Sequence, residues 1–308
     1  MDKTDVILIT GASGLVGSAV AELFKAQGFS RVACVGRDDC DLSDLAATRK
    51  LFEKIRPAYV FHAAARVYGI MGNINNQGQS YFDNTLINTS VVDAARHAGV
   101  KKITAMGSGA VYPYPPASLP LSESTMFDGR PHPSEGAYAH AKRGMLAMLE
   151  AYEQSYGLKW AYIVSCNLFG PRDKFEPITG HVVPALVRKF HDAMQSGGPV
   201  VVWGDGSAQR DFMYVKDVAR VVHIVMQQVD GAINMGSGKV LSIRQIVDAL
   251  SAITGITDRI TWDASKPNGQ DYRAYDLRRL ASTGFKCKYS VEQGLQETWD
   301  WYRSNIPS

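Results

Sequence analysis

Two side chains that could exchange protons stand four residues apart in the stretch EGAYAHAKRGML. Tyr138 and Lys142 fall on one face of the helix predicted over 136–156, because residues four apart lie one turn above each other. A lysine ammonium beside a phenol favours the phenolate, so we expect Lys142 to lower the pKa of Tyr138. Such a tyrosine can exchange a proton with a carbonyl or carbinol oxygen near neutral pH. The spacing alone is weak evidence, because any packed or solvated helix can carry it by chance.

A serine among small residues, Ser108 in MGSGAVYPY, strengthens this interpretation. It follows the predicted strand 101–106 and so lies at the carboxyl edge of the sheet, where open α/β proteins bind ligands. Its hydroxyl could donate to the same oxygen that Tyr138 protonates. Gly107 and Gly109 are expected to let substrate and cofactor come close. Ser108 is therefore predicted to polarise a carbonyl group.

The elements that must position these residues alternate along the first 170 residues. Short β-branched runs predict strands over 5–10, 31–36, 58–63, 101–106 and 160–165. Longer amphipathic segments predict helices over 14–27, 44–55, 79–98 and 136–156. This alternation indicates an α/β fold, a Rossmann-like doubly wound parallel sheet with right-handed crossovers.

The rhythm changes after residue 170 and predicts a smaller, partly interleaved C-terminal substrate domain. Helices are expected near 181–195, 216–229 and 242–254, with short strands over 200–204, 211–215 and 232–236. We assign 1–170 to a cofactor-binding domain to which about 216–240 returns. Residues 171–215 and 241–308 are assigned to substrate binding.

A glycine pattern, ITGASGLVGSAV, directly follows the first predicted strand. Glycines at 11, 14 and 17 permit a tight turn and place a pyrophosphate on the N-terminus of the next helix. The spacing G-x-x-G-x-x-G is less common than G-x-G-x-x-G, so its position between strand and helix carries the argument. The alternative is a strand–helix turn without a ligand. The predicted contacts are Gly11, Ala12, Ser13, Gly14, Leu15, Val16 and Gly17.

The end of the second strand, CVGRDDCDL, bears on the choice of dinucleotide. Arg37 offers a guanidinium to a ribose 2′-phosphate, and this favours NADP(H). Asp38 adjoins it and would suit a free 2′-hydroxyl, so the choice stays open. Asp41 could instead face the adenine edge, and Leu42 and Met106 are further predicted cofactor contacts.

Taken together, these motifs resemble the extended short-chain dehydrogenases/reductases of the nucleotide-sugar epimerase/dehydratase type. Within that family the chain is similar to the GDP-L-fucose synthase group, nearly end to end. The resemblance is carried by HAAARVYGI, NLFGPRDKF, GHVVPALVRKFHDA, VVVWGDGSAQRDFMYVKDVA, INMGSG and DASKPNGQDYR. It implies hydride transfer from NADPH to C4 of a nucleotide-linked 4-keto-6-deoxy sugar. Tyr138 would protonate O4, and Lys142 would bind the nicotinamide ribose.

The resemblance also implies roles on the sugar side of the site. Asn167 would lie near the nicotinamide and the sugar, and His181 would match the family's acid, which works in the epimerisation steps, next to the cofactor. Nucleotide and pyrophosphate would be held by Arg188, Trp203 and Arg210, which suit charge-assisted bonds and stacking. Each has a plainer interpretation as a solvated charge, a core aromatic or a structural histidine.

Two positions depart from the family pattern. The epimerase base of the family is a cysteine two residues after the active-site serine, and here that position is Ala110. We therefore predict a 4-ketoreductase that does not epimerise C3 or C5. Asn268 stands where the family has an aspartate in its substrate site, so GDP is the expected but less firmly indicated carrier.

Other functions on this scaffold stay open at this point. They are an epimerase-reductase that uses another base, a redox-neutral 4-epimerase and a cofactor-binding regulator without chemistry. A 4,6-dehydratase is disfavoured, because SGAVY lacks the acidic residues that usually follow the serine in such enzymes.

Composition sets further expectations. The chain has 308 residues with 33 basic and 30 acidic side chains, which does not favour nucleic-acid binding. Its N-terminus lacks a signal-peptide pattern and no apolar run suits a membrane span. Four scattered cysteines indicate reduced thiols, a cytoplasmic protein and no metal cluster. The family resemblance implies a homodimer through the helices 79–98 and 136–156.

Overall fold

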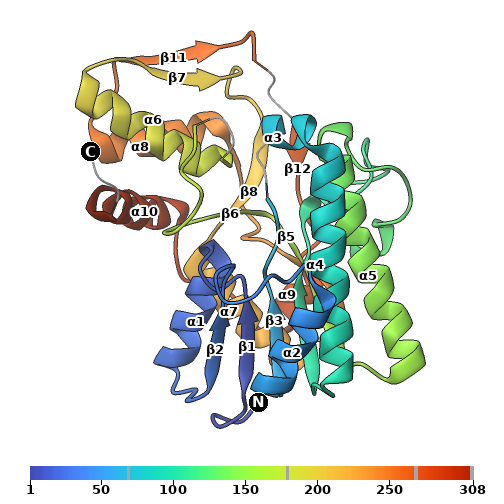
Figure 1. Ribbon diagram of the computed structural model, residues 1–308. Helices are drawn as coiled ribbons and strands as arrows, with labels where there is room; N and C mark the ends of the chain where they lie inside the picture. Colours follow the sequence, from blue (N-terminus) through green and yellow to red (C-terminus); the bar gives the residue numbers. More distant parts are fainter. Residues whose placement is uncertain (68–69, 178–179, 267–269, 306–308) are drawn as a thin grey trace.

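The computed structural model describes residues 1–67, 70–177, 180–266 and 270–305. Its centre is a six-stranded sheet whose neighbouring strands all run parallel (Figure 1). The strands, in order across the sheet, are β2 (Val32–Val35), β1 (Ile7–Thr10), β3 (Tyr59–His62), β4 (Lys102–Met106), β5 (Trp160–Ser165) and β9 (Gly231–Met235). Every residue of β1 and β4 is buried, as expected for strands covered on both faces.

Helices cover both faces of this sheet (Figure 1). One face carries α1 (Leu15–Ala26) and α7 (Val215–Gln228), which pack against each other. The other carries α2 (Leu45–Ile55), α4 (Gln77–His97) and α5 (Gly136–Tyr156), with α4 alongside both α2 and α5. The fold is therefore a Rossmann-like doubly wound α/β fold, as the sequence predicts.

The strand order places a switch point between β1 and β3. The chain leaves β1 toward β2 on one side and later returns to β3 on the other. Crossovers diverge at such a point, so a crevice opens at the carboxyl ends of these strands. The glycine pattern after β1 and Ser108 after β4 both lie at this edge.

The smaller part of the molecule is built on β8 (Gln209–Tyr214), which pairs with β6 (Asn167–Phe169), β10 (Val240–Ser242) and β12 (Tyr272–Arg273). A separate pair joins β7 (Val200–Trp203) to β11 (Ile260–Asp263). Three helices, α6 (Val182–Ser196), α8 (Ile243–Thr254) and α10 (Val291–Asn305), pack together beside these strands (Figure 1). Between these segments the chain returns to the main sheet as α7 and β9. Which ligand each part binds stays a prediction.

Several short elements were not expected from the sequence. They are α3 (Ile70–Asn75), β6, β10, β11, β12, α9 (Arg278–Ser282) and three single 3₁₀ turns, 109–111, 123–125 and 133–135. Most are too short for a periodic pattern to stand out. The longer helix α10, of 15 residues, was also not predicted. Within the described ranges, no helix is both long and apolar enough to cross a bilayer.

Candidate active site

The glycine turn after β1 forms a cradle for an anionic group. Gly11 has a φ of 70°, and a side chain there would lie 2.7 Å from the backbone nitrogen of Ala64. A side chain at Gly17 would overlap the carbonyl of Gly11, so α1 can begin close against β1 only with glycine there. Gly14 precedes α1, and a Cβ on it would meet only the Gly11 carbonyl, at 3.4 Å. The first turn of α1 holds no acidic residue, so this helix N-terminus fits a pyrophosphate.

The end of β2 lies next to this turn. A Cβ on Gly36 would be 3.5 Å from Ser13 Oγ, and Asp39 accepts a hydrogen bond from the Gly36 amide at 2.7 Å. Arg37 is exposed, and within the described residues it makes no hydrogen bond or ion pair. Asp41 instead accepts from the amide and hydroxyl of Ser43, which hold its pKa below the usual range. The Arg37 guanidinium is thus available for a 2′-phosphate, while the Asp41 carboxylate is already hydrogen-bonded to Ser43. The roles of Arg37 and Asp41 in cofactor binding stay predictions.

Lys142 is buried in the wall of the crevice. It is 1 % exposed, and its Nζ donates to the carbonyl of Met106 at 2.8 Å. The same Nζ lies 5.9 Å from the ring centre of Tyr138. Burial lowers the pKa of Lys142 to about 7. The helix α5 thus delivers the Tyr–Lys pair to the end of β4, as the spacing predicts.

The expected lowering of the Tyr138 pKa is wrong for this structure. Burial raises the pKa of Tyr138 well above its usual value, and the nearby Glu135 carboxylate raises it further. Desolvation of the phenolate therefore outweighs any help from Lys142, whose own charge is disfavoured by the same burial. Tyr138 is consequently a neutral phenol, the form that can give up a proton.

Ser108 lies where β4 ends and a short 3₁₀ turn, Gly109–Val111, begins. Its Oγ accepts from the Ala110 amide at 3.2 Å, which fixes the side chain at the head of the turn. The glycines around it also have close neighbours within the protein, while the predicted approach of substrate and cofactor stays a prediction. A side chain at Gly107 would overlap the Tyr162 ring, and one at Gly109 would overlap the Tyr275 hydroxyl. Both glycines make room for buried tyrosines of the protein itself.

The sugar side of the crevice begins at β6. Asn167 opens this strand, is partly exposed and pairs with Phe212 of β8. Its neighbour Cys166 is buried beside Asp211, and burial raises the pKa of its thiol well above the usual value. The two side chains thus have different surroundings, in agreement with the alternation of a strand.

His181 is exposed at the N-terminus of α6, and in the described part of the chain its side chain makes no cap hydrogen bond. The residue that faces it was not found from the sequence. Asp173 accepts from the Lys174 amide at 2.7 Å, but its Oδ2 is buried without a hydrogen-bond partner among the described residues. Burial raises the pKa of Asp173, and the nearby His181 opposes this. His181 therefore lies close enough to stabilise the Asp173 carboxylate.

The residues expected to hold the nucleotide lie in different settings. Arg188 is bound to Asp192 of its own helix, with Nε 2.8 Å from Oδ1. The Trp203 ring has the Lys189 ammonium 5.0 Å from its centre. Arg210 donates to the carbonyl of Gln209 at 2.7 Å, and burial together with the neighbouring Arg273 lowers its pKa to about 10. Asn268 lies outside the described residues.

Arg273 is a further candidate that sequence reasoning missed. It pairs with Arg210 across the β12–β8 register and donates to Glu135 at 3.0 Å, so it links the sugar side to the start of α5. Two adjacent guanidiniums with one carboxylate leave a net positive charge, which suits a pyrophosphate. The signal was available, because Arg273 stands in DYRAYD next to the glycine-containing loop.

The glycine cradle, the Tyr–Lys pair and the serine together define a Rossmann-type, dinucleotide-binding enzyme site. Residues 7–236 match the NAD dependent epimerase/dehydratase family. GDP-L-fucose synthase 1 of Arabidopsis thaliana is 35% identical over 99% of this chain and 95% of its own length. The chain therefore belongs to the NAD dependent epimerase/dehydratase family, and the predicted family is confirmed.

Solved structures are similar over the whole chain. A GDP-6-OMe-4-keto-L-xylo-heptose reductase from Campylobacter jejuni superposes with a TM-score of 0.93, at 27% identity, over 99% of both chains. A GDP-mannoheptose C4 reductase from the same organism, with NADP bound, gives a TM-score of 0.88 at 28% identity, over 98% of this chain and 99% of the other.

Proposed function

We propose that the protein is an NADPH-dependent 4-ketoreductase of a GDP-linked 4-keto-6-deoxy sugar, either a hexose or a heptose. The observation that carries this proposal is the neutral Tyr138 beside Lys142, which is bonded to the Met106 carbonyl at the end of β4, two residues before Ser108. The GDP carrier and the reductase reaction are supported by relatives whose names specify GDP-sugar synthases and reductases. The segments 171–215 and 241–308 would hold the nucleotide sugar.

NADPH is the cofactor, and it supplies a hydride to the carbonyl carbon. The cradle at Gly14 and the first turn of α1 would bind its pyrophosphate, and Arg37 would hold the 2′-phosphate. Lys142 would hold the nicotinamide ribose, whose hydroxyls offer acceptors to an ammonium that otherwise bonds only to the Met106 carbonyl within the described residues. The NADP-bound relative supports this choice of cofactor.

Residues of the chain polarise and then protonate the carbonyl oxygen. Ser108 Oγ, held at the head of its turn, donates to this oxygen and polarises the carbonyl. Tyr138 then gives its phenolic proton to the same oxygen as negative charge develops there. A raised Tyr138 pKa helps here, because the phenol stays protonated until the oxygen becomes more basic than the phenolate. Lys142, with a pKa of about 7, can return a proton to Tyr138 near neutral pH.

The proposed enzyme does not epimerise C3 or C5. That reaction needs a base beside the ketone, and the position two residues after Ser108 is a buried alanine, Ala110. The Cys166 thiol is no replacement, because its raised pKa keeps it protonated. The GDP-L-fucose synthase relative favours the second candidate, a bifunctional 3,5-epimerase-4-reductase in which Asp173, whose pKa burial raises, would serve as base beside His181.

One incubation separates the two candidates. The enzyme is mixed with NADPH and GDP-4-keto-6-deoxymannose in D₂O, and the product is examined by NMR and mass spectrometry. The reductase predicts NADPH oxidation with protium retained at C3 and C5. Deuterium at either carbon, above a control without enzyme, would establish the bifunctional enzyme. A redox-neutral 4-epimerase needs a C4 hydroxyl, so it would leave this ketone unreduced and would instead invert C4 of a GDP-sugar that carries a C4 hydroxyl, without added NADPH. No reaction with hexose or heptose 4-keto substrates would refute the reductase.

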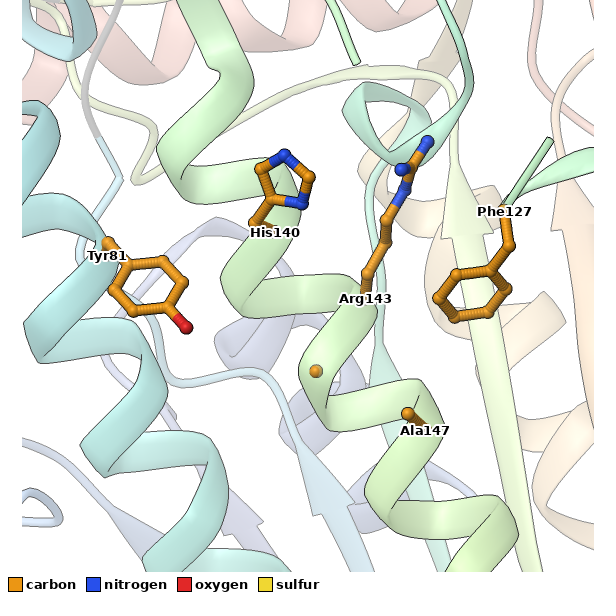
Figure 2. A pocket seen from close by; sticks show the side chains of 6 residues that line it. Tyr81, Phe127, His140, Arg143 and Ala147 are labelled. Atoms are coloured by element: carbon orange, nitrogen blue, oxygen red, sulfur yellow. The ribbon is translucent and has the colours of Figure 1, made fainter. Parts of the chain in front are cut away.

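We further propose that the enzyme is a homodimer formed through α4 and α5. A hollow of about 540 Å³ lies along α5, with Tyr81 of α4 on one side and Phe127 on the other, and is also lined by His140, Arg143, Gly144 and Ala147 (Figure 2). Tyr81 and Phe127 are each about half exposed, at 47% and 52%. Arg143 donates to the carbonyls of Val111 and Gly129, but its buried Nη2 has no hydrogen-bond partner in the described ranges. A second copy would cover the aromatic rings and offer Nη2 an acceptor.

This interface is tested with Ala147→Glu, which places a carboxylate on the proposed contact. Sedimentation should show a dimer for the wild type and a monomer for the variant. A wild-type monomer at micromolar concentration would refute the proposal.

We also expect a cytoplasmic location, which the four free cysteines support.

A further inference from the structure

A second tyrosine reaches the turn that carries Ser108. Tyr275 follows β12, comes from the sugar side of the molecule and is 6% exposed. Its backbone forms a bridge with Leu121, and its ring centre lies 6.1 Å from that of Tyr112. Its hydroxyl occupies the space that a side chain at Gly109 would need. The phenol is therefore wedged against the residue that directly follows Ser108.

This hydroxyl is buried, and among the described residues it has no hydrogen bond of normal distance and angle. The Arg273 guanidinium lies near enough to interact with it, but without that geometry. The neighbouring Tyr112 is different, because its buried hydroxyl has a hydrogen-bond partner: it donates to Asn234 Oδ1 at 2.6 Å. A buried polar atom without a partner destabilises a fold, so a tyrosine rather than a phenylalanine at 275 needs a reason. Stability of the free protein does not supply one.

The surroundings of this hydroxyl point to a ligand. Arg273 lies close enough to lower the pKa of Tyr275, although burial raises that pKa more. The phenol therefore stays neutral and can both donate and accept a hydrogen bond. Arg273 also binds Glu135, three residues before Tyr138. Tyr275 thus lies in a polar cluster that joins the sugar side to both predicted catalytic residues, Ser108 and Tyr138.

We propose that the Tyr275 hydroxyl hydrogen-bonds a hydroxyl of the sugar bound beside Ser108, and that Tyr275 determines which sugars the site accepts. The inference rests on the proposed function, because it assumes a nucleotide sugar in this crevice. A site built to hydrogen-bond a substrate hydroxyl rejects analogues that lack the hydroxyl, since the protein group is then left unpaired again. Tyr275 would accordingly discriminate between hydroxylated and deoxygenated sugar rings.

The test compares Tyr275→Phe with the matched control Tyr112→Phe. Both variants remove one buried phenolic oxygen from neighbouring rings, but among the described residues only Tyr112 loses a hydrogen bond of normal geometry, whereas Tyr275 loses only its approach to Arg273. We expect Tyr275→Phe to keep or raise the melting temperature and to lower kcat/KM for the 4-keto sugar nucleotide at least tenfold. We expect Tyr112→Phe to lower the melting temperature and to change kcat/KM less than threefold.

A binding measurement keeps the inference separate from the proposed function. The affinities of GDP and GDP-mannose are measured by calorimetry for the wild type and both variants. Tyr275→Phe should weaken GDP-mannose binding at least fivefold and leave GDP binding unchanged, whether or not the wild type reduces any ketone. Equal losses for GDP and GDP-mannose, or no loss for either, would overturn the assignment. A wild type that binds GDP-mannose without reducing any 4-keto sugar would refute only the proposed function.

Discussion

Replacing Lys142 by methionine should stabilise the free protein while it removes the activity. The fall in the Lys142 pKa from 10.5 to about 7 corresponds to roughly 5 kcal/mol of unfavourable burial below pH 7. Methionine keeps the length of the side chain but loses the bond to the Met106 carbonyl, which is worth about 1–2 kcal/mol. The net gain for Lys142→Met is therefore about 3 kcal/mol at pH 6.

The sign of the pH dependence follows from proton binding. Between pH 7 and about 10.5 the unfolded chain holds a proton on Lys142 that the folded chain does not, so wild-type stability rises with pH. The variant lacks this contribution, so its advantage should be largest near pH 6 and shrink steadily toward pH 10. Urea unfolding of both proteins at pH 6, 7.5 and 9 measures the difference directly.

Lys102→Met serves as the control, because Lys102 is also buried but has three partners. Its ammonium lies 3.0 Å from Asp230 and donates to the carbonyls of Val225 and Val229. This variant should be less stable than the wild type at every pH. NADP⁺ should stabilise the wild type more than Lys142→Met, because it offers acceptors to the ammonium. A pH-independent difference between Lys142→Met and the wild type would refute the reasoning.

Three further outcomes test the site. Tyr138→Phe should lower the rate of NADPH oxidation about 10²–10⁴-fold with little change in NADP⁺ affinity, as stopped-flow kinetics and calorimetry would show; a rate within tenfold of wild type would exclude Tyr138 as the proton donor. Gly17→Ala should weaken NADP⁺ binding at least tenfold, because its Cβ would overlap the Gly11 carbonyl, whereas Gly14→Ala should weaken it less; calorimetry compares the two, and equal affinities would contradict the cradle. Ala110→Cys should introduce solvent deuterium at C3 or C5 if the missing base alone prevents epimerisation, and NMR of the product in D₂O detects it.

Local patterns predicted the central sheet well because its strands are buried on both faces and its helices are long. The same approach missed β12, which has two residues and exists only because it pairs with β8, some 60 positions earlier along the chain. The absence of α10 from the predictions has a different cause. Val291, Leu295, Trp299 and Tyr302 recur at helical spacing and are all buried, so the periodic signal was present in the sequence.

The residues of the candidate site were likewise predictable only where a local motif marks them. Local motifs identified the glycine turn, Ser108, Tyr138 and Lys142, whose neighbours are set by one strand–helix unit each. The direction of the Tyr138 pKa shift could not be predicted, because it depends on how completely the folded chain buries both partners. Arg273 and Tyr275 have their main contacts, Glu135 and Gly109, far away in sequence, which local patterns do not show. Asp173 lies near His181 in sequence, and it was missed because its burial depends on the folded chain.

Lys142 and Tyr275 share a physical property that ties stability to ligand binding. Lys142 has three donors and one hydrogen bond within the described residues, and the Tyr275 hydroxyl has none. Nearby residues of the same types, Lys102 and Tyr112, are fully engaged. If bound cofactor and sugar complete the missing hydrogen bonds, each ligand stabilises the fold through a different one of these residues. NADP⁺ should then lose part of its stabilising effect only in Lys142→Met, and GDP-mannose only in Tyr275→Phe. If each variant instead lost the stabilising effects of NADP⁺ and GDP-mannose equally, the substitutions would act by loosening the crevice as a whole and not through the missing hydrogen bonds.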